Sequence, residues 1–221
     1  MTLLLPGAPS RAPSRAPPRA APRAPADGYV IWHAVLSRDL CARTIAAIEL
    51  AEAQPGRVLR HGAQQHDAAM RACTEHALTP GDALPVAQAF RCVARLVHNG
   101  APALLDGPRF CRYRQGGHFR AHRDRSHDNA DSHAVRTRRV SLVCLLNDGT
   151  PAFDGGALVL YLPDGGGRFR PVNAPLSAGS VIAFSAELLH EVRPVRQGMR
   201  YSAVAWLYDV PHEESNDAEP V

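Results

Sequence analysis

The chain has 221 residues, of which 45% are hydrophobic and 21% are charged, and its formal net charge at pH 7 is +4. This length and composition are typical of one globular domain with a substantial core. They argue against a helical membrane protein, because no apolar run approaches the roughly 20 residues that a membrane-spanning helix needs.

Residues 1–26 repeat Arg-Ala-Pro units and contain the whole basic excess. The segment has four arginines and no acidic residue, so 21 basic and 21 acidic residues remain in the rest of the chain. Dense proline blocks both helices and sheet ladders, and the segment is therefore predicted to be a disordered tail. Because the body is neutral, the net charge gives only weak support for a nucleic-acid partner.

Residues 27–107 are predicted to form a helical support region. Ser37 can cap a helix that runs through LCARTIAAIELAEA to Pro55, with apolar residues at helical spacing. A second helix is predicted over residues 82–98, before an Asn-Gly pair that ends it. Residues 57–80, between the helices, are predicted to be an extended segment and a loop.

After Pro108 the apolar pattern changes to a period of two, which is typical of strands. Short candidate strands alternate with glycine-rich turns: Arg109–Arg114, Arg139–Leu146, Ala157–Leu162, Arg168–Pro171, Ser180–Phe184, Leu189–Val192 and Arg200–Tyr208. Two helices followed by about seven strands predict a mainly β protein with flanking helices (α+β), folded as a sandwich or jelly roll. The core is predicted over residues 108–210, and residues 211–221 are predicted to be a flexible C-terminal tail.

The five cysteines are an odd number and contain no C-x-x-C pair. Each lies in an apolar or helical context, where cysteine acts as a small hydrophobic residue. They are predicted to be reduced thiols, and the protein is predicted to be cytoplasmic.

His122 and Asp124 lie two residues apart in a segment with extended character. In an extended chain such residues project to the same face, so both side chains can bind one ion. An imidazole and a carboxylate are two thirds of the two-histidine, one-carboxylate facial triad, which suits Fe(II) and oxygen chemistry. Because His-x-Asp is common by chance, the hypothesis needs a third ligand from elsewhere in the chain.

His190, at the start of an apolar strand, is the candidate for the third ligand. His190 and Arg200 flank a turn at residues 194–198 and are predicted to lie on adjacent strands of one hairpin. A guanidinium behind a metal ion can bind a carboxylate through two N–H groups while the other end of that ligand binds the ion. Ser202 and Trp206 are predicted to share the strand face of Arg200.

Three motifs follow one another in the second half of the chain: Tyr113-x-x-Gly116-x-x-Phe119-x-x-His122-x-Asp124, then Asp154-Gly155-Gly156-x-Leu158, then His190-x9-Arg200-Tyr201-Ser202. In order and spacing they resemble the Fe(II)/2-oxoglutarate dioxygenases of the prolyl 4-hydroxylase type, over roughly residues 108–209. The resemblance implies a double-stranded β-helix, or jelly roll, supported by the N-terminal helices.

The resemblance also implies roles for individual residues. His122, Asp124 and His190 are implied to be the iron ligands and thus the catalytic centre. Arg200 is implied to bind the 5-carboxylate of 2-oxoglutarate, and the same site is implied to include Tyr113, Leu158 and Ser202. Trp206 matches an aromatic residue that closes the pocket wall. The implied cofactors are Fe(2+), 2-oxoglutarate as co-substrate and O2, with L-ascorbate as a candidate reductant.

One position departs from the family pattern. Several prolyl hydroxylases have a tyrosine where this chain has Leu145. Loss of that hydroxyl would loosen co-substrate binding or indicate a different prime substrate.

The implied reaction hydroxylates a prolyl or other residue of a peptide, or a small molecule, and releases succinate and CO2. Residues 125–138 lie where family members have substrate-covering loops, and His127 and His133 in them are interpreted as solvated rather than as ligands. A non-catalytic sensor that binds the metal and 2-oxoglutarate is the alternative function. A nucleic-acid oxidative demethylase is disfavoured by the short spacing between His190 and Arg200. No membrane partner is expected, and the oligomeric state is open.

Overall fold

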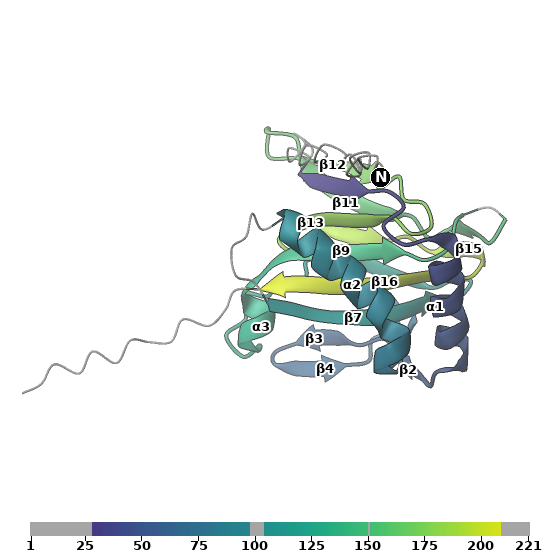
Figure 1. The fold of residues 1–221 in the computed structure, drawn as a ribbon. Helices are drawn as coiled ribbons and strands as arrows, with labels where there is room; N and C mark the ends of the chain where they lie inside the picture. Colours follow the sequence, from purple (N-terminus) through teal and green to yellow (C-terminus); the bar gives the residue numbers. More distant parts are fainter. Residues whose placement is uncertain (1–27, 98–103, 150, 209–221) are drawn as a thin grey trace, which may run out of the picture.

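The computed structural model describes residues 28–97, 104–149 and 151–208 (Figure 1). Its three helices are α1 (Arg38–Leu50), α2 (Pro80–Val97) and α3 (His133–Arg136). Its strands are β1 (Tyr29–Trp32), β2 (Ala53–Pro55), β3 (Val58–Arg60), β4 (Ala63–Gln65), β5 (Arg71–Ala72), β6 (Thr74–His76), β7 (Leu104–Tyr113), β8 (His118–His122), β9 (Arg138–Leu145), β10 (Phe153–Gly155), β11 (Leu158–Pro163), β12 (Phe169–Asn173), β13 (Val181–Ser185), β14 (His190–Val192), β15 (Val195–Gly198) and β16 (Arg200–Tyr208).

Two antiparallel sheets form the body of the described chain. The major sheet has the order β1-β13-β9-β16-β7-β6-β2, and the minor sheet has the order β12-β11-β14-β8-β5. Neighbouring strands are mostly distant in the chain, as in a jelly roll. The predicted fold class, mainly β with flanking helices, is therefore confirmed.

The core consists of two layers, one on each side of the major sheet. Between the sheets, apolar side chains from β7, β9, β11, β13 and β14 pack against one another. On the outer face, α1 and α2 lie across the major sheet and bury residues such as Ile48 and Phe90 (Figure 1). Consecutive residues of β9 pack into different layers: Cys144 packs toward the helices, and Leu145 packs between the sheets.

Helix α1 begins as predicted, since the Ser37 hydroxyl accepts a hydrogen bond from the backbone N–H of Leu40 at 3.2 Å. The predicted continuation toward Pro55 is wrong, because α1 ends at Leu50 and Ala53–Pro55 forms strand β2. A proline disfavours the helical conformation of the residue before it. Pairing of β2 with β6 in the major sheet supplies the backbone hydrogen bonds instead.

The segment predicted as extended chain and loop at residues 57–80 contains four short strands. β3 and β4 pair as a hairpin, whereas β5 joins the minor sheet and β6 joins the major sheet. The chain therefore crosses between the sheets at residues 72–74. The region predicted as helical support thus contributes strands to both sheets, including β1, which the prediction missed.

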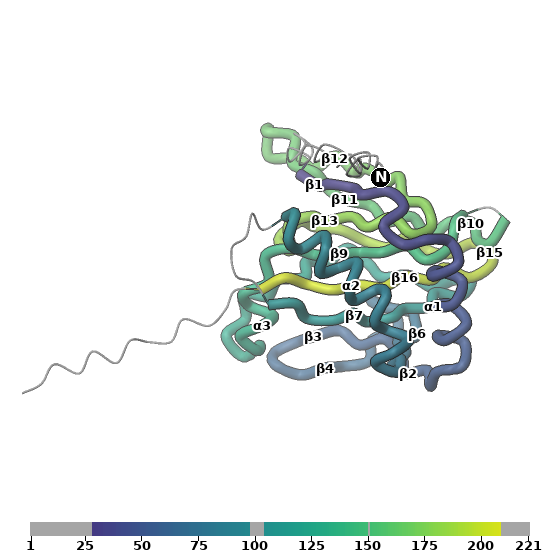
Figure 2. Tube along the Cα trace, in the orientation of Figure 1, coloured from purple at the N-terminus to yellow at the C-terminus, as the bar shows by residue number. Residues whose placement is uncertain are grey.

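The predicted hairpin of His190 and Arg200 is wrong. β14, which carries His190, lies in the minor sheet between β11 and β8, and β16, which begins at Arg200, lies in the major sheet between β9 and β7. Between them β15 pairs with β10 in a separate two-stranded sheet, and this carries the chain from one sheet to the other (Figure 2). The two residues therefore lie on different sheets, and both line the space between them.

The five cysteines are free thiols, as predicted. Among the described residues no helix combines the length and the apolar character needed to cross a membrane. The predicted tails at residues 1–26 and 211–221 lie outside the described residues.

Candidate metal centre

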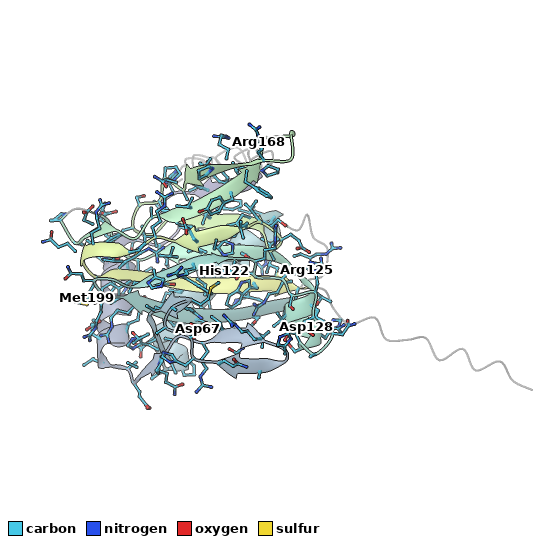
Figure 3. The ribbon with its side chains drawn as sticks, turned by 180° about the vertical axis from the view of Figure 1, so that it is seen from behind. Asp67, His122, Arg125, Asp128, Arg168 and Met199 are labelled. Carbon is cyan, nitrogen blue, oxygen red and sulfur yellow. The ribbon has the colours of Figure 1, made fainter. Side chains whose placement is uncertain are left out.

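His122, Asp124 and His190 form one cluster, in which one ligand atom from each residue lies within 4.8 Å of the others. His122 ends β8 and is the direct cross-strand partner of His190 on β14, so the sheet register alone brings the imidazoles together. Asp124 follows β8, and its backbone N–H donates to the carbonyl of Ala186 at 3.0 Å. Figure 3 shows His122 near the middle of the face seen from behind.

The two imidazoles are held in the tautomer that a metal ligand needs. Nδ1 of His122 contacts the carbonyl oxygen of Arg120 at 2.8 Å, and Nδ1 of His190 contacts that of Leu188 at 2.9 Å. Because a carbonyl oxygen only accepts, each Nδ1 carries the hydrogen, and the Nε2 lone pair is free. Both Nε2 atoms lie 3.5 Å from an oxygen of Asp124.

The Asp124 carboxylate is kept ionised. Burial alone would raise its pKa, but the two imidazoles and the hydroxyl of Ser141, which donates to Oδ2 at 2.5 Å, outweigh burial and hold the pKa far below its ordinary value. Burial lowers the pKa of His190 to about 4, so this imidazole is neutral at pH 7. A neutral imidazole and an anionic carboxylate are the forms that bind a divalent cation.

Aromatic rings fix the imidazoles from the side. The ring of Phe119 stacks on His122 with centroids 3.5 Å apart, and Phe184 meets His190 edge-on at 4.8 Å. Two histidines and one carboxylate on one side of an ion leave its other positions open, which is the ligand set of non-haem Fe(II) sites.

A small chamber of about 50 Å³ lies beside the cluster, between the two sheets. All seven predicted site residues line it: Tyr113, His122, Asp124, Leu158, His190, Arg200 and Ser202. Trp206 lines the chamber as well, whereas Leu145 packs in the core between the sheets and is not part of the chamber wall.

Arg200 is the unusual residue of the chamber. It is only 2% exposed, and its Nη1 donates to the hydroxyl of Ser202 at 2.9 Å. Its guanidinium also lies 5.3 Å from the ring centroid of Tyr113, its cross-strand partner. No carboxylate of the described chain forms an ion pair with it. A buried guanidinium without a counter-ion is energetically unfavourable, so an anionic ligand is its natural partner.

The chamber extends along β16. Arg200, at one end, pairs with Tyr113, and Trp206, six residues further on, pairs with Ser141 of β9. Since Ser141 contacts Asp124, the cluster lies toward the Trp206 end of the strand and Arg200 lies away from it.

Sequence reasoning missed Ser141, the hydrogen-bond donor to Asp124. The signal was present, because Ser141, Val143 and Leu145 alternate along β9, and Val143 and Leu145 face the interior. A serine hydroxyl buried on the inward face of an otherwise apolar strand is energetically unfavourable unless it forms a hydrogen bond. It also missed Arg71, which is buried and lines the chamber. No local pattern distinguished it from other arginines.

The loop histidines take no part in the cluster. The ring of His127 contacts Glu187 at 3.1 Å, and His133 begins the short helix α3 on the exposed side of the loop. Within the described residues, the only group of three or more potential ligands is His122, Asp124 and His190.

Comparison with known proteins matches residues 108–208 to the family model of the 2OG-Fe(II) oxygenase superfamily. A PKHD-type hydroxylase of Pseudomonas putida strain W619 is 31% identical over 126 residues, which cover 57% of this chain and 51% of the relative. A PKHD-type hydroxylase of Thermosynechococcus vestitus is 36% identical over 106 residues, 48% of this chain and 44% of the relative. The chain thus spans about half the length of the curated relatives it matches.

Two solved structures share the fold over most of the chain. The crystal structure of a Pseudomonas putida prolyl-4-hydroxylase has a TM-score of 0.62 and 25% identity, and covers 85% of this chain and 96% of its own. A prolyl hydroxylase from Trichoplax adhaerens, solved with a hypoxia inducible factor peptide fragment, has a TM-score of 0.65 and 18% identity, with 84% and 86% covered. The second comparison supports the fold alone.

Proposed function

We propose that residues 108–208, which match the family model of the 2OG-Fe(II) oxygenase superfamily, form a 2-oxoglutarate-dependent dioxygenase that hydroxylates a prolyl residue of a peptide and releases succinate and CO2. The observation that carries the proposal is Arg200, which is buried in the chamber that the His-Asp-His cluster borders and has no carboxylate partner among the described residues.

His122, Asp124 and His190 would hold the iron, because their free Nε2 atoms and carboxylate converge from one side. When bound, Fe(II) supplies oxygen activation and the decarboxylation of the co-substrate. The protein fixes the tautomers through two backbone carbonyls and orients the Asp124 carboxylate through the hydroxyl of Ser141. Such partners of the ligands tune metal affinity.

Arg200 would bind the far carboxylate of 2-oxoglutarate. Its guanidinium is fixed by the Ser202 hydroxyl and by the Tyr113 ring, so that little side-chain freedom is lost on binding. Tyr113, Ser202 and Leu158 would line the co-substrate, the first two as polar partners and Leu158 as an apolar wall. All three side chains are buried, which would limit the access of bulk water to a bound co-substrate.

The peptide substrate is supported by the name of one structural neighbour, the prolyl-4-hydroxylase of Pseudomonas putida. A peptide fits the open side of the cluster, because the chamber itself is too small for one. L-ascorbate remains the proposed reductant.

The test is succinate formation by the full chain after anaerobic loading with Fe(II), followed by 2-oxoglutarate and oxygen. The parent protein should form succinate, and His190→Ala should form none. Arg200→Ala should raise the KM for 2-oxoglutarate by about 100-fold, since a buried charge-assisted pair contributes about 3 kcal/mol. Arg196→Ala is the matched control, because Arg196 is an exposed arginine four residues earlier whose ion pair with Asp154 contributes little.

Failure to bind Fe(II) in the parent protein would contradict the proposal. Binding of both metal and 2-oxoglutarate without succinate, in the presence of proline peptides, would instead identify a non-catalytic binding module.

A further inference from the structure

A second cavity, here called the outer cleft, opens over the metal cluster and has a volume of about 260 Å³. It shares His122, Asp124, Phe119, Trp206 and Arg71 with the chamber, so the cluster and three neighbouring side chains separate the two spaces. A molecule in the outer cleft therefore reaches the open side of the metal site while 2-oxoglutarate fills the chamber. This is the place for the prime substrate of the proposed reaction.

The outer cleft is strongly basic in a protein whose body is neutral. Seven of the residues that line it are arginines, and only Asp124 and Asp131 are acidic. Asp124 is a proposed metal ligand. Asp131 is 6% exposed and accepts a hydrogen bond from the backbone N–H of Gly62 at 2.7 Å. Neither aspartate forms an ion pair with an arginine among the described residues, although the charge of Asp131 offsets part of the positive charge of the cleft.

Five of the seven arginines form ion pairs with acidic residues that do not themselves line the outer cleft. Ion pairs join Arg60 to Asp67 at 2.8 Å, Arg71 to Glu75 at 2.6 Å, Arg125 to Glu187 at 3.4 Å, and Arg138 to Asp106 at 2.7 Å. Arg109 shares Asp106 with Arg138 at the longer distance of 3.4 Å, and its side chain is 38% exposed.

Two arginines of the outer cleft have no carboxylate partner among the described residues, namely Arg57 and Arg123. Arg123 donates to the backbone carbonyl of Glu187, and Arg57 is exposed. Because Arg109 and Arg138 share Asp106, and Asp131 offsets one charge, the outer cleft holds a surplus of about two positive charges. This surplus suits one or two carboxylates rather than a polyanion such as nucleic acid, which needs a longer basic surface and stacking rings.

The backbone around Arg57 is fixed. Its carbonyl accepts a hydrogen bond from Nη1 of buried Arg71 at 2.9 Å, and the N–H of the preceding Gly56 donates to the carbonyl of Cys73 at 2.9 Å. Arg57 is thus anchored to a side chain that borders both cavities.

The walls of the outer cleft are tied to each other. The β3–β4 hairpin, which follows Arg57, contacts the loop of residues 125–138 at its tip: Gly62 binds Asp131, and His61 contacts Asp128 at 2.8 Å. Figure 3 shows Arg125 and Asp128 on the same side of the molecule as His122. The hairpin and the loop that carry several of the basic side chains are therefore held together by these contacts.

We infer that the outer cleft selects a peptide whose target proline is flanked by acidic residues, and that Arg57 and Arg109 bind the flanking carboxylates. The inference rests on the proposed function. Guanidinium groups bind carboxylates in planar, two-point contacts, and a basic cleft also raises the local concentration of an acidic peptide.

The test compares peptides of equal length in which one proline is flanked by Asp and Glu, by Asn and Gln, by Lys, or by phosphoserine. Oxygen incorporation is measured by mass spectrometry with the full chain, Fe(II) and 2-oxoglutarate. The acidic peptide should show a kcat/KM at least about tenfold above that of its amide counterpart, a difference of about 1.4 kcal/mol. The ratio should fall with added salt, because the arginines involved are partly exposed.

Substitutions test whether Arg57 and Arg109 cause the preference for the acidic peptide. Arg57→Gln should raise the KM for the acidic peptide several-fold with little change in kcat, and Arg57→Glu should shift the preference toward the Lys peptide. Arg109→Gln should reduce the ratio as well. Arg168→Gln is the matched control and should leave the ratio unchanged, because Arg168 is exposed and lies at the far edge of the molecule from His122 (Figure 3).

Equal turnover of the acidic and amide peptides, or an unchanged preference in Arg57→Glu, would overturn the inference. So would stronger turnover of the phosphoserine peptide, or turnover of free acidic amino acids in place of peptides. Succinate formation with no peptide hydroxylated would overturn the inference and leave the dioxygenase assignment standing. Absence of Fe(II) and 2-oxoglutarate binding would remove both.

Discussion

At the scale of single residues, Ser141 is the partner that orients the proposed metal ligand Asp124. Its hydroxyl donates to Oδ2 of Asp124 at 2.5 Å, and Ser141 itself is 1% exposed. Ser141→Ala should lower the affinity for Fe(II), or for Mn(II) as an oxygen-stable substitute, by about 10- to 100-fold. Anaerobic titration calorimetry measures this, with Ser177→Ala as the control. Unchanged metal affinity in the folded variant would show that Asp124 does not need this donor.

Gly156 lies directly behind Arg200. It has a φ of +60°, and a Cβ atom there would lie 2.9 Å from Cδ of Arg200 and 3.0 Å from Cγ2 of Val195. Gly156→Ala should therefore displace the guanidinium and weaken 2-oxoglutarate binding by about tenfold, or about 1.4 kcal/mol. The backbone strain itself should lower the stability by about 1 kcal/mol.

Gly165→Ala separates the two effects of the Gly156 substitution. Gly165 has a φ of +81°, and a Cβ atom added there would have no neighbour within 4 Å, so its replacement introduces backbone strain alone. It should lower the stability by a similar amount while the KM for 2-oxoglutarate stays that of the parent. A similar KM change in both variants would show that strain, not Arg200, is responsible.

At the scale of elements, Glu49 fastens helix α1 to the major sheet. Its carboxylate accepts hydrogen bonds from Tyr201 of β16 at 2.8 Å and from Arg112 of β7 at 3.0 Å. Burial alone would raise the pKa of Glu49, but these two donors outweigh it, and the pKa is lowered from 4.5. Desolvation and the Glu49 carboxylate raise the pKa of Tyr201 to about 12.

Because the folded-state pKa of Glu49 is lowered, its stabilising contribution is present above pH 4.5 and is lost as the pH falls below that value. Glu49→Gln should lower the free energy of unfolding by about 1 kcal/mol at pH 7, a modest figure because the side chain is 40% exposed. Urea unfolding at pH 7 and at pH 3 should show the difference shrinking at the lower pH. Glu52→Gln is the control, and a difference that persists at pH 3 would contradict the assignment.

The long elements could be predicted from the sequence, and the short ones could not. β9 and β16 are mostly apolar runs of eight and nine residues, and α2 has an apolar face over 18 residues. The strands between residues 53 and 76 have only two or three residues each, too few for a period to appear. Their pairing partners lie elsewhere in the two sheets, so tertiary context alone determines them.

The sheet change between β14 and β16 was also beyond prediction. A turn of five residues between two apolar strands is typical of a hairpin. Here Val195–Gly198 pairs with β10 instead, and the backbone hydrogen bonds go to Phe153–Gly155. The partner strand is about 40 residues away in the chain, and no local sequence pattern indicates this pairing.

At the scale of the whole molecule, motif spacing was sufficient to predict the proposed iron ligands and Arg200 in the chamber, but not Arg71 or the surroundings of the chamber. The four proposed ligand and anion-binding residues come from β8 and the residues just after it, from β14 and from β16, and the fold brings them together as the family resemblance implied. The charge of the outer cleft could not be read from the sequence. A neutral body gave no hint that arginines from residues 57, 109, 123 and 138 would line one cavity.

Residues 1–26 are predicted to be dispensable for the reaction. The described residues that line the chamber and the outer cleft fall within residues 57–206. Deletion of residues 1–26 should leave the rate of succinate formation and the KM for 2-oxoglutarate unchanged within about twofold. Loss of activity in a truncated protein that keeps its melting temperature would assign a role to the Arg-Ala-Pro repeats.

Arg200 lies at one end of β16 and the metal cluster lies toward the other end. The separation along this strand therefore sets the length of the dicarboxylic acid that can contact both. Inward-facing positions on a strand are two residues, or about 6.6 Å, apart, which is far coarser than one carbon–carbon bond. Relocating the guanidinium along the backbone therefore changes the accepted length in large steps. Discrimination between diacids that differ by a single methylene must come from the reach of one side chain, which Ser202 and Tyr113 hold in place.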